Sequence, residues 1–194
     1  MTDITTYIPL IIGVFIIIAI LVFIALFFVI TYNKLVTMRN RVRNQKSQID
    51  VELKRRFDLV PNLVEVVKGY AAHEKSALED IIKARNTYVA AGANTGEALG
   101  ADNALSGALS KLFALSESYP DLKANTNFVS LQADLSGIEQ KIVYSRQFYN
   151  DSVFMLNNKI EKFPSNMVAN MFNFEPETFF EATDTEKENV KVSF

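Results

Sequence analysis

The chain has 194 residues, including 22 Asp or Glu, 20 Lys or Arg and a single His, and its net charge is −2. It contains no Cys, which excludes disulfides, thiolate metal sites and a cysteine nucleophile. With one His, a zinc or haem site of the usual kind is hard to build, so composition already argues against most metal and thiol chemistry.

The N-terminal part is apolar, and residues 8–30 contain no charged residue. As a helix, Leu10 to Ile30 would rise about 31 Å, enough to cross a hydrocarbon core of roughly 30 Å. A cleaved signal peptide is the alternative, but such peptides have a basic start and a small-residue cleavage site, which this segment lacks. We therefore predict an N-terminus at residues 1–7 outside the membrane and a transmembrane helix at residues 8–31.

Basic residues follow this span and none precedes it: Lys34, Arg39, Arg41, Arg43 and Lys46. The positive-inside rule then predicts an external N-terminus and a cytoplasmic C-terminal part. Residues 34–56 carry a net charge of +6, and residues 57–194 carry −7. The basic block favours anionic lipid headgroups near Lys34–Lys46; the alternative is a topology signal on a solvated helix face. The acidic remainder argues against binding of nucleic acid.

Apolar residues after the span recur at helical spacing, beginning with the heptad steps Leu35, Val42 and Ile49. The pattern predicts a helix over residues 35–90 that is kinked, not interrupted, at Pro61. It further predicts a loop at residues 91–103 and helices at residues 103–118 and 126–163, the last ending in Phe163 on its inward face. Asn125 or Thr126 can cap the last helix. The expected fold class is all-α, with the transmembrane helix continuing into an elongated antiparallel four-helix bundle over residues 32–163.

The chain beyond this bundle changes character, with six Phe set among acidic residues from Phe163 to Phe194. We expect a short helix and an aromatic strap at residues 164–182. Residues 183–194 are expected to form a flexible acidic tail, which either binds a partner or is simply a frayed terminus.

Polar residues at or beside core positions form the candidate site. Two lie in the phase of the segment before residue 90, and five step along one shoulder of the last helix: Glu74 and Arg85, then Gln132, Glu139, Arg146, Asn150 and Asn157. They can form a hydrogen-bonded rim that fixes helix register, a polar pocket, or a subunit interface. In each case we expect ion pairs such as Glu74 or Glu139 with Arg85 or Arg146. We assign no catalytic, cofactor-binding or metal-binding residue, because His73 directly precedes Glu74 and the Glu-x-x-His pattern of bundle di-metal sites is absent.

Several motifs resemble the LemA family in order and spacing. They lie at Lys54–Val64 (KRRFDLVPNLV), Gly69–Glu74 (GYAAHE), Glu117–Asn125 (ESYPDLKAN), Asn157–Ile160 (NNKI) and Phe163–Pro164. The resemblance covers roughly residues 30–181 and leaves residues 183–194 outside. It implies a single-pass protein of the bacterial cytoplasmic (inner) membrane with a cytoplasmic helical bundle, and it implies no accepted enzymatic activity.

These features predict a non-enzymatic, membrane-anchored scaffold that self-associates or recruits protein partners not identifiable from the sequence. The alternative is a membrane-tethered sensor that binds a small polar ligand in the polar row. A pocket lined by both carboxylates and arginines would favour the sensor. An enzyme has little support, since the sequence offers neither a Ser-His-Asp arrangement nor a phosphate-binding glycine loop.

Overall fold

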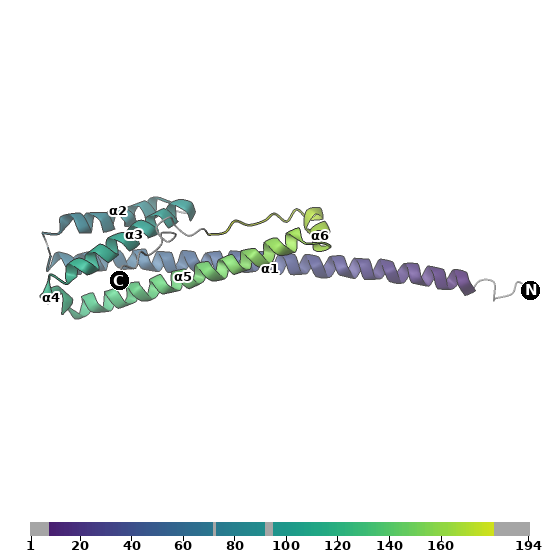
Figure 1. The fold of residues 1–194 in the computed structure, drawn as a ribbon, viewed down its shortest axis with the longest axis horizontal. Helices are drawn as coiled ribbons and strands as arrows, with labels where there is room; N and C mark the ends of the chain where they lie inside the picture. Colours follow the sequence, from purple (N-terminus) through teal and green to yellow (C-terminus); the bar gives the residue numbers. More distant parts are fainter. Residues whose placement is uncertain (1–7, 72, 92–94, 181–194) are drawn as a thin grey trace, which may run out of the picture. The chain divides into compact units, whose positions relative to one another are not determined.

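The structure, a computed structural model, describes residues 8–71, 73–91 and 95–180 (Figure 1). Every regular element in these residues is a helix, so the all-α prediction is confirmed for the described chain. The helices are α1 (Ile8–Lys68), α2 (Lys75–Ala91), α3 (Thr95–Ser116), α4 (Pro120–Lys123), α5 (Thr126–Glu161) and α6 (Ser165–Met171). The predictions for residues 1–7 and 183–194 lie outside the described residues.

Helix α1 is 61 residues long and continues through Pro61 without interruption. Its most apolar stretch has a mean hydropathy of 3.5, with none of it buried inside the protein, and the helix is long and apolar enough to cross a membrane. Large side chains from Leu10 to Ile30 are exposed, including Phe15 and Phe23 at more than 70%. An apolar surface of this size is far larger than a protein in water tolerates.

The chain divides into two compact units, the first formed by residues 1–45 and 148–194. Buried apolar side chains from three helices form its core: Leu35 and Val42 on α1, Val153, Leu156 and Ile160 on α5, and Val168 and Ala169 on α6. Tyr32 on α1 contacts the rings of Phe172 and Phe174, at centroid distances of 4.7 and 5.9 Å. These contacts hold α6 against the part of α1 that follows the apolar run.

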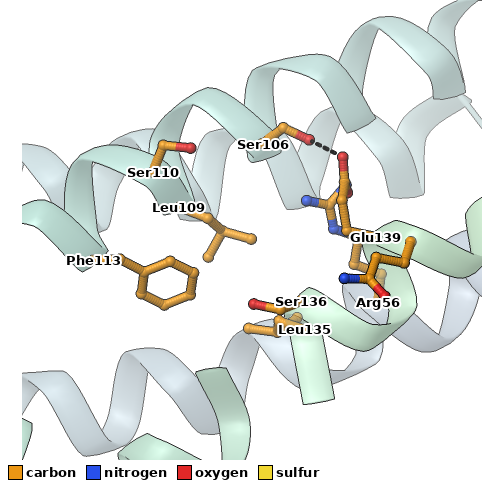
Figure 2. Close-up of a pocket in the computed structure, with 9 residues that line it drawn as sticks. Arg56, Ser106, Leu109, Ser110, Phe113, Leu135, Ser136 and Glu139 are labelled. Atoms are coloured by element: carbon orange, nitrogen blue, oxygen red, sulfur yellow. Dashed lines mark hydrogen bonds and ion pairs between the residues drawn. The ribbon is translucent and has the colours of Figure 1, made fainter. Parts of the chain in front are cut away.

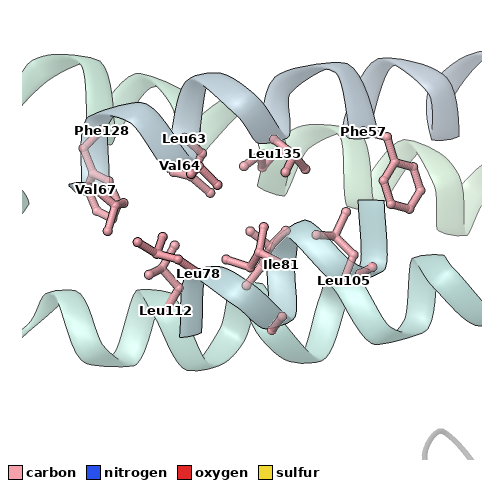
Figure 3. Packing of buried hydrophobic residues seen from close by; sticks show 14 of the residues in the cluster. Phe57, Leu63, Val64, Val67, Leu78, Ile81, Leu105, Leu112, Phe128 and Leu135 are labelled. Carbon is pink, nitrogen blue, oxygen red and sulfur yellow. The ribbon is translucent and has the colours of Figure 1, made fainter. Parts of the chain in front are cut away.

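The second unit comprises residues 46–147. Figure 3 shows side chains of α1, α2, α3 and α5 meeting in one apolar cluster, among them Leu63, Ile81, Leu105 and Phe128. The ring of Phe57 stacks on that of Tyr88 at 3.9 Å. Helix α5 starts where predicted, since the amide of Phe128 donates to the Asn125 side chain at 3.0 Å, a standard N-terminal cap.

The expected single helix over residues 35–90 is wrong, because α1 ends at Lys68 and α2 begins only at Lys75. Gly69 has a low helix propensity, and the chain turns there through bonds from the amides of Tyr70 and Ala71 to the Val67 carbonyl. The break resets the helical phase. Ile81 is therefore fully buried, whereas Val89, which continues the helical spacing of the apolar residues before the break, is 62% exposed.

Two further boundaries differ from prediction. Most of the expected loop at residues 91–103 belongs to α3, which begins at Thr95, because alanines there favour a helix and Ala98 and Ala101 bury against the core. Helix α5 ends at Glu161 rather than Phe163, and the Phe163 side chain is 79% exposed instead of inward. Phe163 precedes Pro164, a position that disfavours helical backbone.

Candidate functional site

A buried group of charged side chains joins three helices of the second unit. Asp102 of α3 has a side chain that is only 2% exposed, and it receives two guanidinium groups. Arg56 of α1 donates from Nη1 to Asp102 Oδ1 at 2.6 Å, and Arg146 of α5 donates from Nη2 to Asp102 Oδ2 at 2.8 Å. Both carboxylate oxygens of Asp102 are thus engaged, one by each neighbouring helix.

Glu139 completes this group from α5. Its Oε2 lies 2.5 Å from Arg56 Nη1, as an ion pair without hydrogen-bond geometry, and its Oε1 accepts from Ser106 Oγ at 3.4 Å (Figure 2). The Glu139 side chain is 41% exposed, whereas that of Arg56 is 3% exposed. We call Arg56, Asp102, Glu139 and Arg146 the charge cluster; its two positive and two negative groups cancel.

The charge cluster constrains how the helices of this unit pack. A buried ion is costly unless it is paired, and removing one partner leaves an uncompensated charge in the interior. Arg56 can be neutralised only while α3 and α5 hold Asp102 and Glu139 beside it. The cluster therefore fixes the relative register of α1, α3 and α5 within this unit.

A cavity of about 330 Å³ adjoins the charge cluster, between α3 and α5. Leu109, Phe113 and Leu135 supply its apolar walls, and polar side chains supply the rest: Arg56, Ser106, Ser110, Ser136, Glu139 and Gln140 (Figure 2). An open hollow of this size, with one guanidinium, one carboxylate and several hydroxyls, can hold a small polar molecule. Within the described ranges no group of three His, Asp or Glu side chains is placed to hold a metal ion.

A second polar arrangement lies in the first unit, along α5. The Asn157 side chain donates to the Glu177 carbonyl at 2.8 Å and accepts from the Glu177 amide at 2.9 Å. Asn150 makes the same pair of bonds to Phe180, each at 2.9 Å. From Asn150 to Asn157 the helix rises ~10.5 Å, and from Glu177 to Phe180 an extended chain spans ~10 Å. Because the two lengths agree, the two asparagines can bind residues three apart in a segment that runs antiparallel to α5.

Tyr149 adds a third bond to this segment, since its hydroxyl donates to the Thr178 carbonyl at 3.0 Å. Its ring also contacts that of Phe180 at 4.5 Å. Burial raises the pKa of Tyr149 above its ordinary value, and the nearby Glu177 carboxylate adds to the effect. The neutral phenol is thus favoured, which keeps its proton available to Thr178. We call residues 173–180 the strap.

A family model described as the LemA family matches residues 45–194. The chain belongs to the LemA family. The match includes residues 183–194, which lie outside the resemblance drawn from the motifs. It begins at residue 45, whereas the resemblance begins near residue 30.

Curated relatives of this LemA-family chain are 27% identical to it over the aligned residues. The magnetosome protein MamQ of Magnetospirillum gryphiswaldense is 27% identical over 174 residues, covering 77% of this chain and 64% of the relative. Magnetosome protein MamQ 2 of Paramagnetospirillum magneticum is 27% identical over 175 residues, with the same coverage. Protein LemA of Metamycoplasma hominis is 27% identical over 164 residues, covering 83% of this chain and 74% of the relative. The chain thus spans less than two thirds of the length of the MamQ proteins it matches.

The candidate residues named from the sequence of this LemA-family chain separate into different places. Glu139 and Arg146 belong to the charge cluster, and Asn150 and Asn157 bind the strap. Glu74 lies in the turn before α2, where its carboxylate accepts from the Tyr119 hydroxyl at 2.8 Å. That bond raises the pKa of Tyr119.

The remaining two candidates are half-buried without a described partner. Neither Arg85 nor Gln132 has a hydrogen bond or ion pair to another described residue, and the buried Nε of Arg85 is unsatisfied there. The expected pairing of Glu74 or Glu139 with Arg85 or Arg146 is also wrong among the described ion pairs. Glu139 pairs with Arg56, and Arg146 pairs with Asp102.

Sequence reasoning missed Arg56 and Asp102, although a signal for both exists. Arg56 lies seven residues after Ile49 and seven before Leu63, both buried core residues. Asp102 precedes Leu105, another core residue, by three. A charged residue at a position where the helical spacing predicts a buried apolar side chain is the signal that identifies the cluster.

Proposed function

We propose that this LemA-family protein is a membrane-anchored helical scaffold, in which α1 crosses the membrane once and continues directly into the folded part. The supporting observation is the continuity of α1 from Ile8 to Lys68. One helix contributes an exposed apolar run, then the buried Leu35 and Val42 of the first unit, then Leu53 and Phe57 of the second. The apolar run and these buried positions lie on one helix, so no non-helical linker separates the span from the folded part.

The finer features of this proposal concern the topology of the chain and the packing of its helices. The helical part lies on the cytoplasmic side of the bacterial cytoplasmic membrane, with the N-terminus outside, because basic residues follow the span. Its helices form an antiparallel four-helix bundle, and the basic residues at Lys34–Lys46 face anionic headgroups.

The charge cluster supports a structural role over a catalytic one. Asp102 has both oxygens occupied by guanidinium groups and is 2% exposed, so it is not available as a general base. Its geometry instead stiffens the unit that a scaffold presents to its partners. Exposed apolar side chains on α5, Val143 and Tyr144 among them, provide surface for self-association or for a protein partner.

A small-ligand sensor is the second candidate, and one observation favours it. The cavity beside the charge cluster is lined by both a carboxylate, Glu139, and a guanidinium, Arg56. A zwitterionic or hydroxylated molecule there would find complementary charges and the hydroxyls of Ser106, Ser110 and Ser136.

Native mass spectrometry of the full-length chain in detergent separates the two functions. The scaffold predicts a discrete oligomer without a bound small molecule, and the variants Val143→Ser and Tyr144→Ser shift it towards the monomer. The sensor predicts a small-molecule adduct that Glu139→Gln removes and that Lys141→Gln, at an exposed position of the same helix, retains. A monomer without any adduct contradicts both self-association and the sensor, and leaves recruitment of a different protein as the only form of the scaffold.

A further inference from the structure

The outer surface of α6 and of the α5–α6 turn is unusually apolar. Phe163 is 79% exposed, Met171 62%, Met167 55% and Phe172 47%. The opposite face of α6 is packed, since Val168 and Ala169 are fully buried. The segment is thus anchored on one side and exposes four large apolar side chains on the other.

This surface lies beside the end of the apolar run of α1. Both belong to the first unit, and Figure 1 shows α6 at the end of α5 that lies towards the apolar run. Tyr32, which contacts Phe172 and Phe174, lies two residues beyond Ile30, an axial rise of ~3 Å. Thr31 is 4% exposed although its neighbours Ile30 and Tyr32 are not buried. The level of α6 along α1 is therefore the level at which the apolar run ends.

Basic side chains surround a hollow next to this surface. A cavity of about 250 Å³ is lined by Lys34 of α1 and by Lys159 and Lys162 at the end of α5 and just beyond it. Its other lining side chains are apolar or neutral: Met38, Phe154, Met155 and Asn158. None of the three ammonium groups forms an ion pair with another described residue. Three cations and no acid around one hollow favour an anionic group such as a phosphate.

We propose that this surface docks on the bilayer that α1 spans, with Phe163, Met167, Met171 and Phe172 in the boundary between headgroups and acyl chains and the three lysines on the phosphates of anionic lipids. Interfacial segments of proteins combine these features: apolar side chains at shallow depth, aromatic rings at headgroup level and lysines reaching the phosphates. Lipid is favoured over a protein partner because α1 itself sets the bilayer surface at this level. The inference rests on the spanning role of α1 in the proposed function.

Tryptophan fluorescence tests the proposal, because the chain contains no Trp and each substitution adds a single reporter. Full-length Met167→Trp and Phe163→Trp are placed, one copy each, in nanodiscs containing phosphatidylcholine and phosphatidylglycerol. We expect blue-shifted emission, and at least twofold quenching by lipids brominated near the headgroup end of the acyl chain. Val89→Trp, exposed in the second unit, is the matched control and stays unquenched.

The lysines are tested in the same nanodiscs. Lys159→Gln with Lys162→Gln lowers the quenching of Met167→Trp when phosphatidylglycerol is present, and Lys141→Gln leaves it unchanged. The proposal is overturned if lipid quenches neither Met167→Trp nor Phe163→Trp. If these reporters are in addition protected from aqueous acrylamide, a protein and not lipid covers the surface. Phe23→Trp, within the apolar run, separates the two levels of inference. Because Phe23 lies ~10 Å below Ile30 along α1, this reporter is read with lipids brominated deeper in the acyl chain. Failure of these lipids to quench it contradicts the spanning of α1, whereas quenching of Phe23→Trp alone contradicts only the docking of α6.

Discussion

At the scale of single residues, Asp102 and Glu139 show how burial changes what one carboxylate contributes to the charge cluster. It is enclosed in the core between helices and is neutralised by two guanidinium groups from α1 and α5. Glu139 contacts the same Arg56 but is 41% exposed, so water can replace much of the stabilisation that its ion pair gives to the Arg56 charge. The two carboxylates of one cluster should therefore respond very differently to substitution.

Asp102→Asn should lower the free energy of unfolding by about 3–5 kcal/mol, because it leaves Arg56 buried without a full countercharge. Glu139→Gln should cost ~1 kcal/mol or less, since its pair is solvated. Thermal and denaturant unfolding of the full chain in detergent, followed by circular dichroism, measures both, with the exposed Asp134→Asn as the control.

Double variants resolve which side chains are direct partners. Asp102→Asn and Arg146→Ala should be non-additive by at least ~1 kcal/mol, since they share a hydrogen bond. Glu139→Gln and Arg146→Ala should come closer to additivity because their side chains bind different groups. A larger coupling for the second pair would contradict the described geometry.

Tyr149 gives a pH prediction. Its pKa is raised in the folded chain, mainly by burial, so the fold favours the neutral phenol. The stabilisation is therefore fully present below the unfolded pKa near 10 and is lost as the pH rises through the higher folded pKa. Tyr149→Phe should be ~1 kcal/mol less stable than wild type at pH 8, and the difference should shrink above pH ~10. A difference that stays constant from pH 8 to 12 would count against this role.

The sequence predicts those residues of the charge cluster and of the strap contacts that lie on one helix, but not the partners that they contact on other elements. Glu139, Arg146, Asn150 and Asn157 are recognisable because they share one shoulder of a single long helix, where spacing alone fixes the face. Their partners cannot be read in that way. Asp102 lies on a helix whose first turns resemble a loop, and the strap binds through its backbone, which leaves no side-chain pattern.

At the scale of elements, helix phase explains what was predicted and what was not. The stripe through Pro61 is correct because the missing amide of one proline is tolerated while flanking core residues such as Val60 and Val64 stay in phase. The break at Gly69 was missed because an apolar residue, Ala71, continues the spacing within the turn. Residues after the break then keep helical periodicity but bury a different face.

The strap makes a prediction at this scale. Asn157→Ala removes both bonds to Glu177, and Asn150→Ala removes both bonds to Phe180. At about 1 kcal/mol per bond, each substitution should speed hydrogen exchange of the matching amide at least tenfold, measured by mass spectrometry on the full chain. Asn158→Ala is the matched control, since the hydrogen bond described for that side chain lies within α5. Unchanged exchange at both amides would show that the asparagines do not hold the strap.

At the scale of the whole molecule, the prediction concerns the side of the membrane on which the helical part lies. Lys34, Arg39, Arg41, Arg43 and Lys46 follow the apolar run, and no basic residue precedes it. Basic residues next to a span are retained on the cytoplasmic side, which leaves the N-terminus outside. A fluorescent protein fused after Phe194 should therefore fluoresce in cells, and alkaline phosphatase fused there should be inactive, with the opposite result for fusions before Asp3.

Replacing Arg39, Arg41 and Arg43 by Gln should weaken this bias and produce a mixed population, because the remaining lysines supply less of the signal. Protease added to intact spheroplasts provides an independent check: digestion of the helical part in the wild-type chain would reverse the topology and would place the charge cluster, the strap and α6 outside the cell.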